Sequence, residues 1–123
     1  MVNCLLIDKN PAERQKLQEM LGDIGFHCDE RNGAEEGIRF CQEQHPDVVM
    51  MEASGVKAAK EFLRLVKYQG RKSSRPIVIL YADKPNVAQV GETIIQGAAD
   101  FLVKPFDRDL LLFKLEQAGV FIN

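Results

Sequence analysis

Charged residues follow three of the apolar runs in this sequence, at the points where those runs end. Asp8 and Lys9 follow the first run, Glu52 follows the third and Lys104 follows the fifth. Short apolar runs bounded by turn residues are typical of buried strands. In a parallel α/β sheet, ligands and chemistry are found at the edge where the strands end. The sequence therefore predicts a cluster of carboxylates and ammonium groups that could hold a cation or form an internal ion pair.

The elements that must position this cluster alternate regularly along the 123 residues. Strands are predicted at 2–7, 26–30, 47–51, 77–81 and 100–103. Each is followed by a helical pattern, with predicted starts at Asn10, Asn32, Lys57, Pro85 and Asp107. Glu13 and Glu35 stand where they would complete capping boxes with Asn10 and Asn32. Strands that alternate with helices predict an α/β domain with a parallel sheet covered on both faces.

Composition excludes several classes of protein. The net charge of −2 gives no electrostatic case for a nucleic-acid partner. No run approaches the roughly 20 apolar residues that span a bilayer, and the first residues lack a basic leader. Cys4, Cys28 and Cys41 follow no metal-binding or disulfide spacing, so each is expected to pack as a small apolar residue. A cytoplasmic location without cofactor or membrane contact is expected.

Three segments resemble the receiver domains of bacterial two-component response regulators. They are GAADFLVKPFD at 97–107, LLIDKNPAE at 5–13 and PDVVMME at 46–52. The resemblance extends over the whole chain. It implies a CheY-like, flavodoxin-like sheet of five parallel strands in the order 2-1-3-4-5. It also implies one receiver-like domain over residues 1–123, with no output domain.

The resemblance assigns a role to each charged strand end. In this family two acids after the first strand hold magnesium, and an aspartate that ends the third strand accepts a phosphoryl group. A Ser or Thr ending the fourth strand and a lysine after the fifth complete the site. Asp8 matches the first acid and Lys104 the lysine, whereas Lys9 replaces the second acid and Glu52 the acceptor. The hydroxyl position falls on Tyr81 or Ala82.

These replacements disfavour the family's chemistry. The formal charges of Asp8, Glu52, Lys9 and Lys104 sum to zero. An ammonium group beside a bound cation costs about 4 kcal/mol per positive charge at ~4 Å and an effective dielectric of ~20. We therefore expect neither a bound metal nor phosphoryl transfer, and no enzymatic activity. Instead, Glu52 is expected to form an ion pair with Lys104 or Lys9, unless it is a solvated relic.

The resemblance also implies the surface through which such a domain acts. It is formed by the fourth helix, fifth strand and fifth helix, which here gives residues 87–96, Phe101 and residues 107–114. The residues expected to report or make contact there are Phe101, Val90, Ile94, Asp107, Leu111 and Lys114. The predicted function is that of a stand-alone pseudo-receiver in phosphorelay signalling, which binds a histidine kinase, a phosphotransferase, another regulator or a second copy of itself.

Two alternatives stay open on the sequence alone. The chain could be a phosphorylatable regulator that uses Glu52 or Ser54 as an unusual acceptor. It could also be a flavin-binding protein of the same topology, although the loop DKNPAE lacks the Gly, Ser and Thr donors that cradle a phosphate. Tyr81 could be a plug over the site or an ordinary residue at a strand end.

Overall fold

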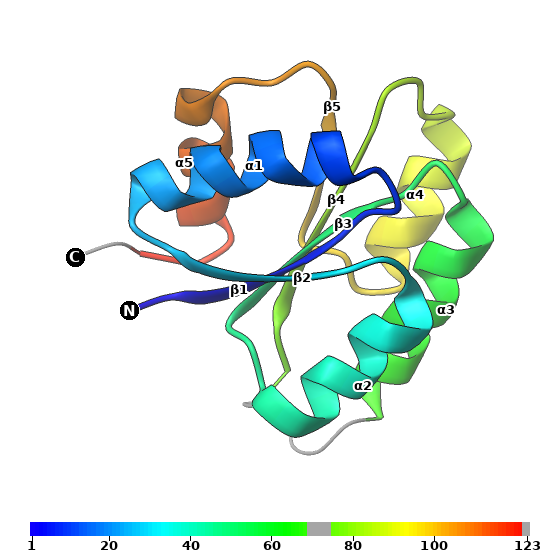
Figure 1. Ribbon diagram of the computed structural model, residues 1–123. Coiled ribbons are helices and arrows are strands. Elements are labelled where there is room, and N and C mark those ends of the chain that lie inside the picture. Colours follow the sequence, from blue (N-terminus) through cyan, green and yellow to red (C-terminus); the bar gives the residue numbers. More distant parts are fainter. Residues whose placement is uncertain (69–74, 122–123) are drawn as a thin grey trace.

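The structure, a computed structural model, describes residues 1–68 and 75–121. Five strands form a parallel sheet in the order β2-β1-β3-β4-β5, as predicted (Figure 1). The strands are β1 (Asn3–Ile7), β2 (His27–Arg31), β3 (Val48–Glu52), β4 (Ile77–Ala82) and β5 (Asp100–Val103). The helices are α1 (Pro11–Ile24), α2 (Ala34–Gln44), α3 (Val56–Lys67), α4 (Val87–Ile95) and α5 (Arg108–Gln117).

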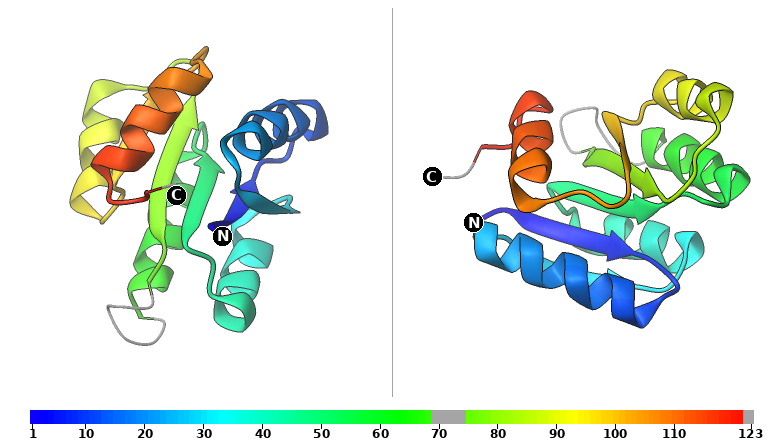
Figure 2. Two further views of the ribbon diagram at one scale, coloured as in Figure 1. Left: turned by 90° about the vertical axis from the view of Figure 1, so that its left-hand side faces the viewer. Right: turned by 90° about the horizontal axis from the view of Figure 1, so that it is seen from above.

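Helices cover both faces of the sheet. α1 and α5 lie on one face, while α2, α3 and α4 lie on the other (Figures 1 and 2). Successive strand side chains point to opposite faces, so Cys4 and Leu6 join the core under α1 and α5, and Leu5 and Ile7 join the core under the other helices. All four are almost fully buried, which explains why the central strands are apolar at consecutive positions.

Local capping signals explain where some helices begin and end. The Asn10 side chain accepts hydrogen bonds from the backbone N–H groups of Ala12 and Glu13, so α1 starts where predicted. Gly25 ends α1 with a φ of 105°, in the left-handed region that glycine adopts without strain. Asp107 caps α5 by accepting from Leu110 N–H, as predicted.

Two other predicted helix starts were wrong. α2 begins after Gly33 with no side-chain cap, because the Asn32 amide oxygen instead accepts a hydrogen bond from Arg14. α4 begins at Val87 with Asn86 as its cap, two residues after the predicted start at Pro85. The first error arose because the Asn32 side chain had another donor within reach, and sequence spacing alone does not select among donors.

Helix α2 lies unusually close to β1. A Cβ atom placed on Gly37 would clash with Cδ1 of Ile7 and come within 3.4 Å of the Phe62 ring. Ile7 directly precedes Asp8 in the chain, so this tightly packed position lies next to the charged strand end. Among the described helices, none is long and apolar enough to cross a membrane.

Candidate functional site

The sheet register brings the charged strand ends to one edge. Ile7 pairs with Met51, Glu52 pairs with Tyr81, and Ala82 pairs with Val103. Asp8 and Lys104 follow directly, so the four predicted strand-end positions are neighbours. Asp8, Lys9 and Glu52 line a cavity of about 370 Å³, and Glu52, Ala82 and Lys104 line an adjacent cavity of about 430 Å³.

The Asp8 carboxylate is buried, and both of its oxygens accept hydrogen bonds. Its Oδ2 accepts a 2.8 Å hydrogen bond from the Tyr81 hydroxyl, and its Oδ1 accepts a 2.9 Å bond from Asn10 N–H. Only 5% of Asp8 is exposed. Such bonds are needed because a buried carboxylate without donors is strongly destabilising. Each oxygen of the first predicted ligand therefore already accepts one hydrogen bond within the protein.

Tyr81 reaches Asp8 from the core under α1 and α5. It is 1% exposed, and its ring packs edge-on against Phe106 with centroids 6.2 Å apart. Burial is the main reason that the pKa of the Tyr81 phenol is raised, and the adjacent Asp8 charge raises it further. The phenol therefore stays protonated and remains a hydrogen-bond donor. Of the two alternatives for Tyr81, this geometry favours a side chain that covers the candidate site and disfavours an ordinary residue at a strand end.

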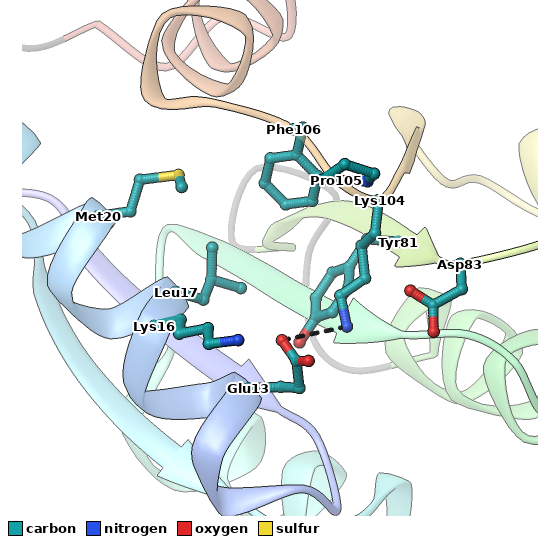
Figure 3. A pocket seen from close by; sticks show the side chains of 9 residues that line it. All are labelled: Glu13, Lys16, Leu17, Met20, Tyr81, Asp83, Lys104, Pro105 and Phe106. Atoms are coloured by element: carbon teal, nitrogen blue, oxygen red, sulfur yellow. Dashed lines mark ion pairs between the residues drawn. The ribbon is translucent and has the colours of Figure 1, made fainter.

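Lys104 is paired with Glu13 of α1. Its Nζ lies 3.5 Å from the Glu13 carboxylate and 5.4 Å from the centre of the Tyr81 ring. These groups share a cavity of about 280 Å³ between α1 and the segment after β5, with Leu17, Met20 and Phe106 as its apolar lining (Figure 3). The predicted capping-box role of Glu13 is wrong, because Asn10 N–H is taken by Asp8 and the Glu13 carboxylate turns to Lys104.

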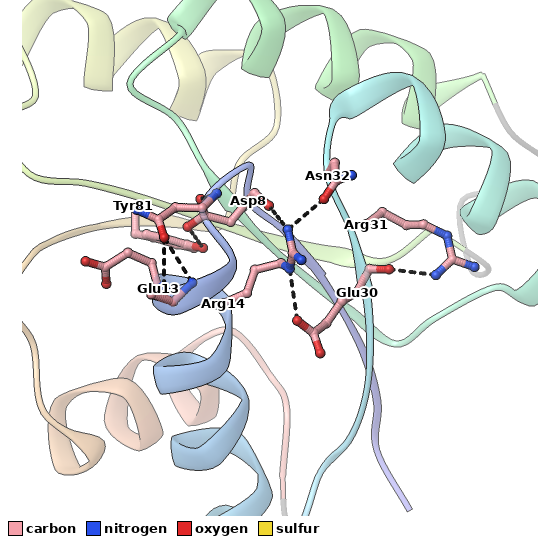
Figure 4. Close-up of polar contacts among 9 residues, drawn as sticks. Asp8, Glu13, Arg14, Glu30, Arg31, Asn32 and Tyr81 are labelled. Atoms are coloured by element: carbon pink, nitrogen blue, oxygen red, sulfur yellow. Dashed lines mark hydrogen bonds and ion pairs between the residues drawn. The ribbon is translucent and has the colours of Figure 1, made fainter.

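Arg14 ties the loop that carries Asp8 to strand β2. Its Nε lies 2.9 Å from Glu30 Oε1, and its Nη1 donates to the Asp8 backbone carbonyl and, at 2.7 Å, to Asn32 Oδ1 (Figure 4). The Arg14 side chain is only 15% exposed. Sequence reasoning missed this residue. The sequence places Arg14 six residues after Asp8, in the first turn of α1, so its side chain is close to the loop that carries Asp8.

Glu52 does not form the predicted ion pair. Its carboxylate turns back on its own loop and accepts from Ser54 N–H at 2.6 Å through Oε1 and 3.2 Å through Oε2. Within residues 1–68 and 75–121, no lysine nitrogen lies within 4.0 Å of it, and Lys104 is held by Glu13 instead. The local amide is available without ordering a long lysine side chain, which has an entropic cost. The predicted pairing of Glu52 with Lys104 or Lys9 is therefore wrong.

The site residues do not form a magnesium ligand set. Magnesium requires an octahedral shell of oxygen atoms at short distances. Here Asp8 is bound to Tyr81 and Asn10, Glu52 is bound to its own turn, and Lys9 stands exposed beside them. In the part of the chain that the structure describes, no group of three His, Cys, Asp or Glu side chains is arranged to hold a metal ion.

The residues predicted for the interaction face have different environments. Ile94 is 43% exposed and Asp107 is exposed, whereas Val90 and Phe101 are partly buried, with Phe101 packed against the core under α2, α3 and α4. Lys114 lies 3.0 Å from Asp100 and joins α5 to β5. Leu111 is fully buried, because it faces the sheet together with Leu115 one turn later, so its place on a contact surface is corrected.

The predicted contact elements α4, β5 and α5 carry several large exposed apolar side chains, of which only Val103 lay outside the predicted residues. Val87 and Ile95 of α4 are 88% and 81% exposed, and Val103 of β5 and Phe113 of α5 are 53% and 55% exposed. These four residues, together with Ile94, are called the apolar face below. For the three residues of α4, the sequence already shows apolar residues on sides of the helix other than the one that faces the core.

The doubly wound fold with charged strand ends defines the class, and comparison with known proteins gives the family. The model of the response regulator receiver domain matches residues 4–116. The chain is 30% identical to protein PilH of Pseudomonas aeruginosa, over 91% of this chain and 93% of PilH. It is also 30% identical to the chemotaxis protein CheY of Bacillus subtilis, over 88% and 89% of the two chains. The chain belongs to the response regulator receiver domains.

Solved structures agree with this fold. The chemotaxis response regulator CheY4 of Vibrio cholerae superimposes with a TM-score of 0.84 over 96% of this chain and 98% of that chain, at 24% identity. An orphan response regulator of H. pylori superimposes with a TM-score of 0.79 over 95% of each chain, at 25% identity. The predicted CheY-like fold is therefore confirmed.

Proposed function

We propose that this chain is a pseudo-receiver: it signals by binding a protein partner, without being phosphorylated and without magnesium. The observation that carries the proposal is the buried hydrogen bond from Tyr81 to Asp8. It places the buried Tyr81 hydroxyl directly against the carboxylate that a metal would need. Glu52 supports the same conclusion, because it stands at the acceptor position implied by the resemblance and its carboxylate is folded onto Ser54 N–H.

The proposed contact surface is the apolar face. Large apolar side chains exposed on neighbouring elements are candidates for protein contact. Val87, Ile94 and Ile95 come from α4, and Val103 and Phe113 come from the next two elements of the chain. The proposed partner is a histidine kinase, a phosphotransferase, another regulator or a second copy of this chain, all of which belong to two-component signalling.

Phosphorylation is tested with acetyl phosphate and with an active histidine kinase. The expected result is no hydroxylamine-sensitive adduct, because an acyl phosphate on a carboxylate is labile to that reagent. An adduct mapped to Glu52 would overturn the proposal. A hydroxylamine-stable phosphate on the exposed Ser54 would equally overturn it, in favour of a regulator with an unusual acceptor.

Magnesium binding is tested by following the amide resonances of Asp8 and Ser54 during titration. The parent chain is expected to show no saturable shifts at millimolar magnesium. The variant Lys9→Asp/Glu52→Asp restores the acids but keeps the Tyr81 hydroxyl on Asp8, so weak binding is expected. Adding Tyr81→Thr frees Asp8 and should strengthen binding. Saturation in the parent chain would contradict the proposal.

The contact surface is tested by placing a charge in it. Ile95→Asp and Phe113→Asp should weaken self-association or binding to a cognate kinase, because a charged group would have to be desolvated at the interface. Tyr68→Asp is the matched control, since Tyr68 is 78% exposed and lies at the end of α3. Equal effects of all three variants would rule out the apolar face as the contact surface.

A further inference from the structure

Two cysteines stand side by side on neighbouring strands. Cys4 of β1 is the register partner of Cys28 of β2. Register partners in a parallel sheet direct their side chains to the same face, and both thiols contact the core under α1 and α5. Cys41 lies on α2 in the core of the opposite face and therefore cannot join them.

The two thiols differ in access and in acidity. Cys4 is 1% exposed, whereas Cys28 is half-buried on β2, the edge strand of the sheet. The neighbouring Cys4 thiol lowers the pKa of the Cys28 thiol, although burial and the nearby Glu30 and Asp29 oppose this. The same contact and burial raise the pKa of Cys4. Since the thiolate is the reactive form, Cys28 is the thiol that an oxidant would meet first.

We propose that Cys4 and Cys28 form a reversible redox pair that responds to hydroperoxides. In the first step the Cys28 sulfur attacks the peroxide, the O–O bond breaks, and the products are Cys28 sulfenic acid and an alcohol or water. In the second step the Cys4 sulfur attacks the Cys28 sulfur, which releases water and forms the disulfide. The two thiols lose two electrons and two protons in total, and the peroxide takes up both.

Strand spacing explains why this bond would be reversible. Neighbouring strands lie about 4.7–4.9 Å apart. This separation fits the Cα–Cα range of about 4.4–6.8 Å for disulfides, but it is wider than their usual Cβ–Cβ distance of about 3.8 Å. Closing the bond must therefore draw the strands together by about 1 Å. Strained disulfides are more easily reduced, which is the property of regulatory bonds.

The redox pair is connected to the candidate site through β2. Glu30 and Asn32 follow Cys28 by two and four residues, and both are held by Arg14, which also binds the Asp8 carbonyl. A movement of β2 toward β1 at Cys28 would therefore be transmitted to the loop that carries Asp8. Oxidation thus offers a way to change the site that does not depend on phosphorylation.

The experiment treats the folded protein with stoichiometric hydrogen peroxide, removes the peroxide, denatures the chain, alkylates the remaining thiols and digests with trypsin without reduction. The expected product joins residues 1–9 to residues 17–31, with the loss of two hydrogen atoms, in a monomer. Millimolar glutathione should reverse it. Cys41 should be alkylated throughout, and the amide of Asp8 should shift on oxidation.

Single variants serve as controls. Cys41→Ser should behave like the parent, whereas Cys4→Ser should leave a Cys28 sulfenic acid that dimedone traps. Cys28→Ser should leave Cys4 reduced. The proposal is overturned if the parent accumulates sulfinic acid on Cys28 without the linked peptide, or if the three thiols react alike. It is also overturned if linkage occurs only between molecules. These results come from the parent chain, so the proposal stays testable even if Cys4→Ser fails to fold.

Discussion

The two halves of the candidate site are built in different ways. Around Asp8, residues distant in sequence meet: Tyr81 bonds to the carboxylate, Arg14 holds the backbone, and Glu13 pairs with Lys104. Around Glu52, the contact runs only to Ser54, two residues away. The first half is buried and joins α1, β2, β4 and the segment after β5, whereas the second half is an exposed turn.

The two halves should therefore contribute differently to the free energy of unfolding. Contacts between distant residues must all be broken when the chain unfolds, so the Asp8 half contributes to the free energy of unfolding. A hydrogen bond within one turn orders few residues and is easily exchanged for water. Substitutions should therefore be costly in the Asp8 half and nearly silent in the Glu52 half.

The largest expected effect is that of Arg14→Met. This variant removes the ion pair with Glu30 and two hydrogen bonds, and should lower the free energy of unfolding by about 2–3 kcal/mol, because the pair is partly buried. Arg64→Met is the control, because Arg64 makes an exposed pair with Glu61 within α3. Chemical denaturation checks both, and equal losses would mean that Arg14 is no more important than a surface charge.

Tyr81→Phe should have the next largest effect. The ring remains packed, but the charged Asp8 carboxylate loses a buried hydrogen bond. The free energy of unfolding should fall by about 2 kcal/mol. Tyr68→Phe is the matched control, because Tyr68 is exposed. Denaturation of both variants checks this. An unchanged Tyr81→Phe midpoint would show that the Asp8 half is not held by the phenol.

Alkaline pH should destabilise the protein through the same phenol. The folded-state pKa of Tyr81 is raised, so above the unfolded value of about 10 the unfolded chain releases a proton that the folded chain keeps. The free energy of unfolding then falls by about 1.4 kcal/mol per pH unit from this residue. Burial raises the pKa of Cys41 to about 12 and adds a fall of the same sign.

The contribution of Tyr81 is isolated by comparing pH series. Stability measured from pH 9 to 11 should fall less steeply above pH 10 in Tyr81→Phe than in the parent, because both share Cys41. Tyrosinate absorbance should show one of the two tyrosines ionising only on unfolding. Parallel pH curves for the parent and the variant would contradict the raised pKa.

The smallest effect is expected for Glu52→Gln. The glutamine amide oxygen can still accept from Ser54 N–H, so the change in the free energy of unfolding should stay below about 0.5 kcal/mol. Denaturation with Lys104→Met measured in parallel checks this, since Lys104 belongs to the other half. A loss above about 1 kcal/mol for Glu52→Gln would show that Glu52 does form a long-range ion pair in solution.

The fold could be predicted because its signals are local. Apolar runs predicted the strands, and Asn10 and Asp107 predicted two helix starts. The positions of Asp8, Glu52 and Lys104 at one edge followed from strand ends in a parallel sheet. The sequence was less informative about partners, because a charged side chain has several possible partners there and packing selects one.

Tyr81 and Leu111 illustrate what was missed. Tyr81 follows Leu80, so strand alternation directs it to the core under α1 and α5, the side from which Asp8 can be reached. The alternation was visible in the sequence, but the reach of the phenol to Asp8 depends on how β4 is placed relative to β1. Leu111 lies one turn before Leu115, and this spacing already indicated a buried position rather than a contact surface.

The close approach of α2 to β1 has a consequence for the interpretation of mutational scans. Gly37→Ala would ordinarily favour a helix by about 1 kcal/mol, yet here the added methyl group would collide with Ile7. The Ile7 side chain would have to move, and Ile7 directly precedes Asp8. A screen for activity would then score Gly37 as indispensable although it has no side chain to contribute. Intolerance to substitution at this position would measure steric room, not chemistry.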